Sequence, residues 1–489
     1  MKHSVLTLLL LILLSCGIYA QKEAYTWTFG YYAGLSWLPE NQRSFAATGL
    51  GGTANATLDN LPGIFTSKIY TDEGCFSISN KKGELLIYSD GIKIWNGDGT
   101  QIYTGLAGNP TSAQSGIVIT YPRENDRFIC IGIDAYNNNK MNYVKVHATN
   151  SSDAVVEGSA ESFSGHSGLL GESMSSVRHA NGTEWWIVAP GKGSPFHLNA
   201  WAVTSAGVQT TAPVVTTTTI NAPSSQAQGY LKFTPSGKHF AWAAHGDNKL
   251  IYGDFDNSTG EFSNVRSLAI TRAFGLEFSP NQKYLFVTND SGTLYIYDME
   301  ALLSGATTHL KSISSFSGDY RPMQLDYSGR LWMVSRGNRD MYIIDNPNDA
   351  PDNLKMYRLS NFLSSGTSGR VGLPSFSASW WNIGDIESDP QLPVCKETEI
   401  TFSAKLSSSD LSQIASIEWN FGDGTVIDDT NISASISRKH TYAKRGTYTL
   451  TLTPKKTGGE VITEGVKSME VKIHSCTLPV NHNISVMGY

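Results

Sequence analysis

Three aspartates stand at intervals that could bring a set of carboxylates together. Asp254, Asp298 and Asp345 are 44 and 47 residues apart, and paired carboxylates can act as general acid and general base. Each aspartate, however, ends a short apolar run, and the intervals equal the period of the surrounding repeat. A reaction needs unlike groups at one point, so residues in step with a repeat are better explained as turn formers at strand ends.

Other familiar catalytic patterns do not occur in the sequence. His166, His197 and His245 lie in turns rich in glycine and serine, with no paired aspartate or serine motif nearby. There is neither a Gly-x-Ser-x-Gly elbow followed by a triad nor a His-Glu-x-x-His helix. No Cys-x-x-Cys or cysteine–histidine cluster suggests zinc. The sequence therefore predicts no catalytic residue, no metal site and no cofactor.

Two pairs of residues are candidates for contact with a ligand. Arg336 and Arg339 flank a turn that could line the mouth of a ring-shaped domain, the alternative being a solvated loop. Trp380 and Trp381 are adjacent, like Trp185–Trp186, and neighbouring residues of a strand point to opposite faces. One tryptophan of a pair could therefore stack on a sugar ring, and packing between sheets is the alternative.

A repeat of short strands surrounds these candidates. Each unit reads strand, tight turn, strand, turn, strand, and then a weaker fourth strand; in the clearest copy the first three strands begin at Leu231, His239 and Lys249. The turns between first and second strands fall near positions 83, 125, 182, 237, 282 and 329, a spacing of 42 to 57 residues. A period of ~40–50 residues with four strands per unit is typical of β-propeller blades.

The six internal units predict a seven-bladed propeller, with a six-bladed ring as the alternative. A propeller must close its ring, and one blade built from both ends of the domain is the usual device. Trp27 and Phe29 alternate onto one strand face, so we expect them to complete the blade that Phe376 begins. The stretch 39–60 is rich in Gly, Ala, Thr and Asn and is expected to be a long surface loop.

A second kind of domain is indicated near the C-terminus. Trp419 and Phe421 are two residues apart and can enter one core face. Gly422–Gly424, reading Gly-Asp-Gly, predicts a tight turn, and Tyr448–Leu452 alternates with threonine as in a half-buried strand. Together these residues resemble the PKD domain, an Ig-like β-sandwich of extracellular proteins. The resemblance implies a spacer or binding module rather than a catalyst.

The start of the chain carries a further resemblance. Trp27–Leu35 reads Trp-Thr-Phe-Gly-Tyr-Tyr-Ala-Gly-Leu and is similar to the opening of exported propeller–PKD proteins of Bacteroidetes, which are often associated with gliding motility or type IX secretion. Further matches to that group are Gly83–Gly91, His179–Gly182, Gly229–Pro235 and Gly372–Phe376. The resemblance covers nearly the whole mature chain. It implies an architecture and no defined reaction.

The N-terminus has the pattern of a secretory signal peptide. Lys2 and His3 precede an apolar run, Val5–Leu14, that is too short to span a membrane. Cleavage after Ala20 fits a small-residue signal peptidase site. Cys16 lies in a segment that resembles a lipobox, so lipidation of Cys16 is the alternative. The mature chain is expected outside the cell or at the outer-membrane surface, with no transmembrane segment and, in the alternative, a lipid anchor.

Composition and cysteine usage agree with export. Charged residues make up 16% of the chain and the net charge is -6, which argues against nucleic acid as a partner. Cys395 and Cys476 bracket the PKD-like region and are predicted to form a disulfide if they lie at one end of the sandwich. Cys75 and Cys130 lie in apolar strand-like runs, so two buried free thiols are favoured over a bridge.

The predicted organisation is all-β. It comprises a signal peptide (1–20), a β-propeller (22–385), a linker (386–392), a PKD-like sandwich (393–476) and a tail (477–489). The function predicted from it is non-catalytic binding or adhesion, in which the propeller recognises a glycan or a cell-envelope protein. A propeller glycoside hydrolase or lyase is one alternative, and a structural accessory of a secretion or motility apparatus is the other.

Overall fold

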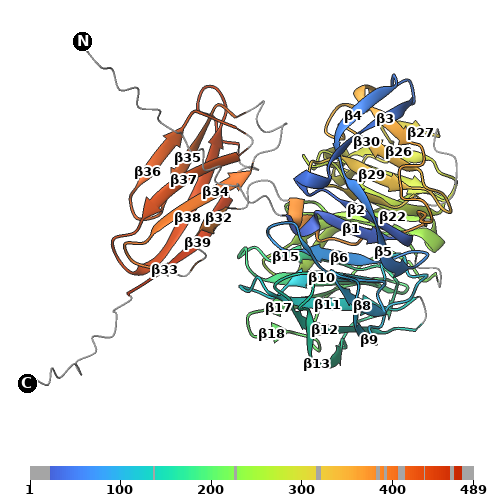
Figure 1. Ribbon diagram of the computed structural model, residues 1–489, viewed down its shortest axis with the longest axis horizontal. Helices are drawn as coiled ribbons and strands as arrows, with labels where there is room; N and C mark the ends of the chain where they lie inside the picture. Colours follow the sequence, from blue (N-terminus) through green and yellow to red (C-terminus); the bar gives the residue numbers. More distant parts are fainter. Residues whose placement is uncertain are drawn as a thin grey trace, which may run out of the picture.

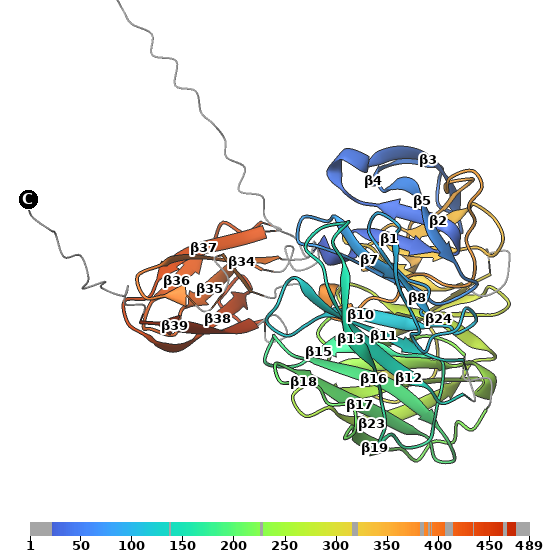
Figure 2. The ribbon, with the colours of Figure 1, turned by 60° about the horizontal axis from the view of Figure 1, so that its bottom comes forward.

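The computed structural model describes residues 22–135, 138–224, 228–314, 321–381, 386–389, 392, 394–405, 414–433, 435–462 and 467–475. The predicted signal peptide, Cys16 and the tail 477–489 lie outside these residues. The described chain forms a large body of many short sheets and a smaller sandwich beside it (Figures 1 and 2). No helix in the described ranges is long and apolar enough to cross a lipid bilayer.

Seven antiparallel sheets make up the large body. The first contains β1 (Thr26–Phe29), β2 (Tyr31–Ser36) and β5 (Gly63–Tyr70). The second contains β6 (Phe76–Ser79), β7 (Leu85–Ser89), β8 (Lys93–Asn96) and β9 (Gln101–Thr104). The third contains β10 (Gly116–Thr120), β11 (Arg127–Ile133), β12 (Met141–His147) and β13 (Val155–Ser162). The fourth contains β14 (Leu169–Leu170), β15 (Ser175–Arg178), β16 (Trp185–Lys192), β17 (His197–Thr204), β18 (Gly207–Val208) and β19 (Val214–Thr217).

The remaining three sheets follow the same plan. The fifth contains β20 (Leu231–Phe233), β21 (His239–Ala244), β22 (Lys249–Asp256) and β23 (Glu261–Ala269). The sixth contains β24 (Ala273–Phe278), β25 (Tyr284–Asn289), β26 (Leu294–Asp298) and β27 (Lys311–Ile313). The seventh contains β28 (Met323–Leu325), β29 (Leu331–Val334), β30 (Met341–Ile344) and β31 (Met356–Leu359), extended by β3 (Arg43–Leu50) and β4 (Ala56–Leu61). The short helices are η1 (Lys22–Ala24), η2 (Pro39–Asn41), η3 (His245–Asp247), α1 (Met299–Leu303), η4 (Pro351–Asn353) and η5 (Ala378–Trp381).

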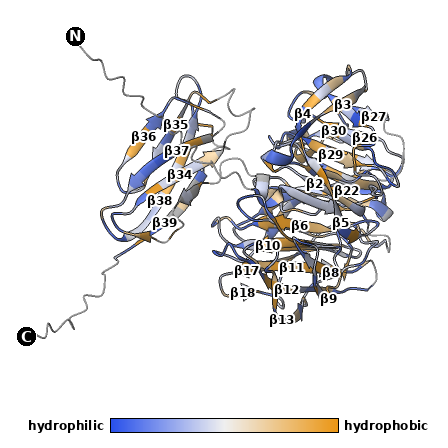
Figure 3. Ribbon diagram, in the orientation of Figure 1, coloured by the Kyte–Doolittle hydropathy of each residue, from blue (hydrophilic) through white to orange (hydrophobic). Residues whose placement is uncertain are grey.

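The sheets are arranged as a ring, which confirms the predicted propeller. The innermost strands lie next to one another in chain order: β1, β6, β10, β15, β20, β24 and β28. The ring closes where Trp27 of β1 meets Trp332 of β29, with ring centroids 6.4 Å apart. All six predicted turns lie between the innermost strand of a sheet and the strand that follows it in the chain. Strands β6, β10 and β11 are largely hydrophobic and the surrounding turns hydrophilic (Figure 3), because both faces of each sheet pack against neighbouring sheets.

The two ends of the ring are distinguished by strand direction. We define the top mouth as the end at which β6, β10, β15, β20, β24 and β28 begin, and the bottom mouth as the end at which they finish. Segments that precede these strands meet at the top mouth. There the Gly74 N–H donates to Ser112 O at 2.8 Å and the Gln114 N–H to Glu172 O at 3.1 Å.

Residues 368–381, here called the axial segment, run through the centre of the ring from the top mouth to the bottom mouth. At the top, Ser368 and Tyr31 exchange backbone hydrogen bonds, and the Val371 N–H donates to Asp72 O at 2.9 Å. Innermost strands have one edge without a partner strand, and its backbone groups need hydrogen bonds. The axial segment supplies some of these bonds.

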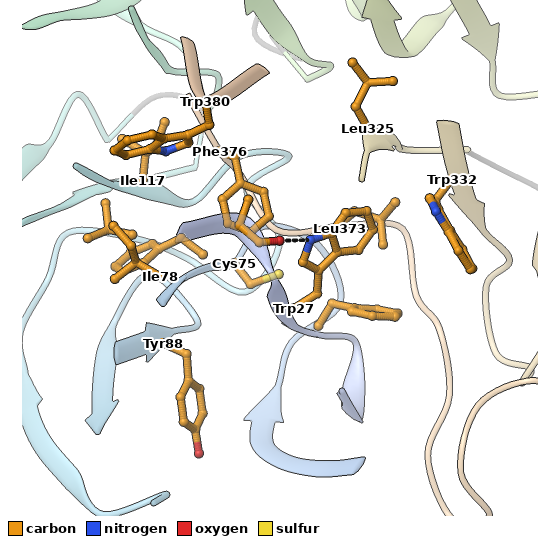
Figure 4. Close-up of a cluster of buried hydrophobic side chains, with 14 of the residues drawn as sticks. Trp27, Cys75, Ile78, Tyr88, Ile117, Leu325, Trp332, Leu373, Phe376 and Trp380 are labelled. Carbon is orange, nitrogen blue, oxygen red and sulfur yellow. Dashed lines mark hydrogen bonds between the residues drawn. The ribbon is translucent and has the colours of Figure 1, made fainter. Parts of the chain in front are cut away.

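Lower in the ring the axial segment contacts several more innermost strands. The Ser375 N–H donates to Cys75 O at 2.8 Å, and the Ser377 hydroxyl donates to Ser176 O at 2.9 Å. All residues from 371 to 380 are buried. Figure 4 shows Phe376 of this segment among side chains of the neighbouring strands, including Cys75. The chain therefore leaves the propeller at the bottom mouth, after filling the axis.

Ring closure differs from the sequence prediction in the strands that achieve it. β1, which carries Trp27 and Phe29, pairs with β2 of the first sheet, and Phe376 lies outside any strand. Phe376 still packs on Trp27, with ring centroids 6.1 Å apart. The sheet shared between the two ends is the seventh. There β3, with Thr48 opposite Arg358, pairs with β31. The stretch 39–60, expected to be a surface loop, thus supplies the closing strands β3 and β4.

The sandwich has two sheets. One contains β32 (Glu387–Asp389), β34 (Glu399–Lys405) and β37 (Ser435–Thr441). The other contains β33 (Val394–Cys395), β39 (Lys467–His474), β38 (Gly446–Lys455), β35 (Ser416–Asn420) and β36 (Val426–Asp429). Trp419 and Phe421 are both fully buried between the sheets, which confirms their predicted place. Gly422 and Gly424 have φ of +76° and +100°, as the predicted tight turn requires.

The predicted linker 386–392 is wrong over its first half. Ile386 belongs to the sandwich core, and β32 pairs with β34 with Ser388 opposite Phe402. The polar composition of this stretch hid a short edge strand, whose side chains need not be apolar on the outer face. The sandwich therefore begins before the predicted residue 393.

The cysteines fall into two groups. Cys75 and Cys130 are free and buried, in agreement with the interpretation as buried thiols. Cys395 is disulfide-bonded, and its predicted partner Cys476 lies outside the described residues. β33 pairs with β39 so that Cys395 stands opposite His474, which is two residues before Cys476 in the sequence.

Candidate binding site

The three aspartates of the repeat are held within their own sheets, near the bottom mouth. Asp254 Oδ1 lies 2.9 Å from Nδ1 of His239, and Asp345 Oδ1 accepts from Arg330 Nε at 2.7 Å. Asp298 caps α1. Each carboxylate is thus engaged by a residue close to it in the same repeat unit, which supports the structural interpretation of this set.

The two candidate arginines have different surroundings. Arg339 donates from Nε to Leu363 O at 2.8 Å and from Nη2 to Asn361 O at 3.3 Å, so it holds a loop in place. Arg336 follows β29 at the top mouth and is exposed, and its charge partly opposes the rise in the pKa of Glu73 that burial causes. Arg336 is therefore the better placed of the two to meet a ligand.

Trp380, a sequence candidate for sugar stacking, is buried. Its exposed fraction is 7%, and its ring centroid lies 5.2 Å from that of Trp185. The Arg178 guanidinium lies over both rings, 4.3 Å from Trp185 and 5.5 Å from Trp380. The rings pack where the axial segment leaves the ring, which is the packing alternative considered above. The side chain of Trp381 lies outside the described residues.

Ionisable groups from several sheets lie at the top mouth. The innermost strands that define this mouth begin there, and the strands that follow them in the chain end there. The carboxyl, lysine and histidine groups whose pKa is shifted with burial as the largest cause include Glu73, Asp90, Glu172, Lys192, His245 and Asp247. Burial disfavours a charged form, so it raises the pKa of the carboxyls and lowers that of lysine and histidine. Ionisable groups with shifted pKa values that gather in one place mark a candidate functional site.

Glu73 and Glu172 form the core of this cluster. Glu172 is fully buried, and burial raises its pKa to about 8, although the Ala113 N–H and Lys192 oppose the shift. Burial and then repulsion from Glu172 raise the pKa of Glu73 well above its ordinary value. Across the described ranges, one oxygen of each carboxyl has no hydrogen-bond partner, and no three Asp, Glu, His or Cys side chains are placed to share a metal ion.

An aromatic stack lies beside these carboxyls at the rim of the top mouth. The Tyr31 and Tyr70 rings are 4.0 Å apart at 11°, and the Tyr32 ring is 5.5 Å from Tyr70. Arg370 lies 4.3 Å over the other side of Tyr31 and donates from Nε to Asp72 at 2.7 Å. Tyr70 is 54% exposed and Tyr32 is 40% exposed. We call Tyr31, Tyr32 and Tyr70 the tyrosine shelf.

The Glu172 carboxyl makes stability fall as pH rises. Its pKa goes from 4.5 to about 8 on folding, so between these values the native state keeps a proton that the unfolded chain has released. Glu172→Gln retains an acceptor for the Ala113 N–H but cannot ionise. We expect the melting temperature of E172Q to exceed that of the wild type by several degrees at pH 8–9 and to match it near pH 4. Thermal scans over this pH range are the measurement.

The matched control for this substitution is Glu261→Gln. Glu261 is exposed on the outer strand β23, so its change should leave the pH profile unaltered. A melting temperature of E172Q that follows that of the wild type at every pH would contradict a buried, protonated Glu172.

The residues of this site escaped the sequence analysis because they belong to no motif. Glu73 and Glu172 each lie a few residues before an innermost strand, β6 and β15 respectively. A search of this position in every repeat unit for ionisable residues could have identified them. Tyr31 and Tyr32 lie inside Trp27–Leu35, the motif quoted for the N-terminal resemblance. Of the residues considered in the sequence, the structure brings Arg336 and His245 to this mouth.

Comparison with known proteins identifies the second domain. Residues 385–473 match the PKD domain family, so the sandwich is a PKD domain. The match begins at 385 and thereby agrees with the inclusion of β32. Curated protein sequences show no match to this chain.

Solved structures resemble the chain weakly. A Lactobacillus plantarum protein is 16% identical, covering 68% of this chain and 99% of its own, with a TM-score of 0.42. A Bacteroides fragilis protein assigned provisionally as a 6-phosphogluconolactonase is 11% identical, covering 68% and 98%, with a TM-score of 0.43. Hsv2 of Kluyveromyces lactis is 11% identical, covering 68% and 98%, with a TM-score of 0.37. Likeness at this level assigns no activity to this chain.

Proposed function

We propose that this protein is an exported binding protein whose propeller recognises its ligand at the top mouth and whose PKD domain serves as a spacer. The observation that carries the proposal is the exposed tyrosine shelf beside Asp72 and Arg370 at that mouth. Large aromatic side chains left exposed next to polar groups are typical of recognition surfaces.

The architecture leaves the top mouth available. The axial segment passes down the ring and delivers the chain to the PKD domain from the bottom mouth, where Arg178 N donates to Ser379 Oγ at 2.8 Å. Filling of the axis by residues 371–380 supports a rigid ring. A rigid scaffold that presents side chains from its connecting segments is suited to binding.

Export and surface location are part of the proposal. They rest on the signal-peptide pattern of residues 1–20 and on the PKD domain, with lipidation of Cys16 as the alternative form of anchoring. The partner would be a glycan or a cell-envelope protein.

A hydrolase or lyase is the second candidate, and the Glu73–Glu172 pair is the observation that favours it. Two carboxyls with raised pKa can supply a general acid. A general acid must come within hydrogen-bond reach of the substrate, and Glu172 is fully buried. Catalysis by Glu172 would therefore require the mouth to open, whereas Glu73 is half-buried and binding at the exposed shelf requires no rearrangement. Recognition is the simpler function for this geometry.

Retention of the full-length protein on immobilised polysaccharides and envelope proteins, with analysis of released products, tests the proposal. We expect retention without product. If the wild type releases product and both Glu73→Gln and Glu172→Gln do not, the protein is a hydrolase or lyase and the proposal of recognition without catalysis is wrong.

A further inference from the structure

We propose that the tyrosine shelf, together with Asp72 and Arg370, is a subsite for one pyranose ring of a carbohydrate. This inference rests on the proposed function and names the ligand class of its site. The shelf supplies an apolar surface of inclined aromatic rings, and the ion pair beside it supplies groups for hydroxyls. A pyranose ring has the matching surfaces, since one face presents C–H groups and the edge carries hydroxyls.

The exposed area of the shelf is the first part of the argument. Tyr31 covers one face of Tyr70, with nearly parallel rings, and yet 54% of Tyr70 remains accessible. Tyr32 adds a tilted second ring, 48° from the plane of Tyr70. Burial of such apolar area by a ligand is favourable, and two inclined rings give a shallow surface rather than a flat one.

The turn between β1 and β2 presents Tyr32. Phe29 of β1 pairs with Ala33 of β2, so Gly30, Tyr31 and Tyr32 form a three-residue hairpin connection. Gly30 and Tyr32 have φ of +58° and +62°, and a left-handed residue commonly ends such a connection. The register of β2 against β5 also shifts between Tyr31 and Ala33. This tight turn holds Tyr32 at the rim of the top mouth, where its side chain stays 40% exposed.

The polar part of the subsite selects among ligand classes. Asp72 Oδ1 accepts from Tyr31 Oη at 3.2 Å and from Arg370 Nε at 2.7 Å, and the Asp72 side chain is 36% exposed. A carboxylate has about four acceptor sites, so Asp72 retains capacity for ligand hydroxyls. The Asp72–Arg370 pair has no net charge and so gives no preference for an ionic ligand, and a purely apolar ligand would leave the ion pair without a role. A neutral polyol with one apolar face satisfies both parts.

Titration of the full-length protein with carbohydrate tests the subsite. Immobilised mannan, β-glucan and chitin first identify a polymer that retains the protein, and soluble oligosaccharides of that polymer are then titrated. We expect Tyr70→Ala to weaken binding by about tenfold or more, a loss typical of an aromatic contact. Tyr70→Phe keeps the ring and should stay within about twofold of the wild type.

The control is Val155→Ala, which removes an exposed apolar side chain on β13 of the third sheet and should leave affinity unchanged. Unaltered melting temperatures establish that each variant is folded. If a polymer is retained and Y70A and Tyr32→Ala bind it as the wild type does, the subsite is wrong and the proposed function stands. If envelope proteins alone are retained, the carbohydrate class is wrong. If nothing in either panel is retained, the proposed function itself fails.

Discussion

Substitution of Trp419 by alanine is expected to unfold the PKD domain while the propeller stays folded. Trp419 is fully buried in β35, within a core separate from the clusters of the ring. Truncation of a buried tryptophan costs ~3–5 kcal/mol, against a total of ~5–15 kcal/mol for a domain. Proteolysis of the full-length variant, with mass mapping of the fragments, should show rapid cleavage within 386–475 and an intact propeller.

Trp419→Phe is the matched control. The indole nitrogen of Trp419 has no hydrogen-bond partner among the described residues, so phenylalanine loses volume and removes an unsatisfied donor. We expect W419F to cost much less than W419A and to resist proteolysis. Equal resistance of W419A and the wild type would show that the sandwich does not depend on this residue. A fragment used to study the domain alone must include Ile386 and β32.

The second large effect is expected from Trp27→Ala, which opens the closure of the ring. The Trp27 ring lies 4.6 Å from Trp37 and 6.4 Å from Trp332, and it packs on Phe376 of the axial segment. Trp27 thus joins the first sheet, the seventh sheet and the axis. Its truncation should cost ~3–5 kcal/mol and expose the core between the first and last sheets.

Calorimetry of the full-length protein measures this effect. The propeller transition should fall by several degrees and aggregation should increase, because an opened ring exposes strand edges. Trp27→Phe, which loses the donation from the indole nitrogen to Ala24 O but keeps a ring, should fall between wild type and W27A. A propeller transition of W27A unchanged from wild type would refute closure through Trp27.

Local features of the fold could be predicted from the sequence. The turns at positions 83, 125, 182, 237, 282 and 329 were predicted because the residues of a tight turn and of its two strands are adjacent in the chain. The same holds for Trp419 and Phe421, whose spacing of two defines a face.

Features that depend on distant partners could not be predicted. β3 pairs with residues about 300 positions later, and no local signal names such a partner. Phe376 lies in an alternating stretch that looks like a strand, but its neighbours are the edges of other sheets around the axis. The burial of Trp380 depends on the path of the chain as it leaves the ring, which strand alternation does not predict.

The candidate site was missed for a related reason. Glu73 and Glu172 come from different sheets, and only the closed ring brings them together at the top mouth. The positive φ of Tyr32 and the register shift between β2 and β5 are properties of the backbone, and a tyrosine in the sequence gives no sign of them. Arg336 was found because it stands in a recognisable turn.

Hydrogen exchange of the full-length protein, with and without the polymer that retains it, tests binding at the top mouth most directly. We predict that the ligand protects amides in the segments that form the rim of the top mouth, which are 31–33, 70–74 and 368–372. Amides around Arg178 at the bottom mouth and in the PKD domain should exchange at unchanged rates. Protection confined to the PKD domain or to the bottom mouth would contradict recognition at the top mouth.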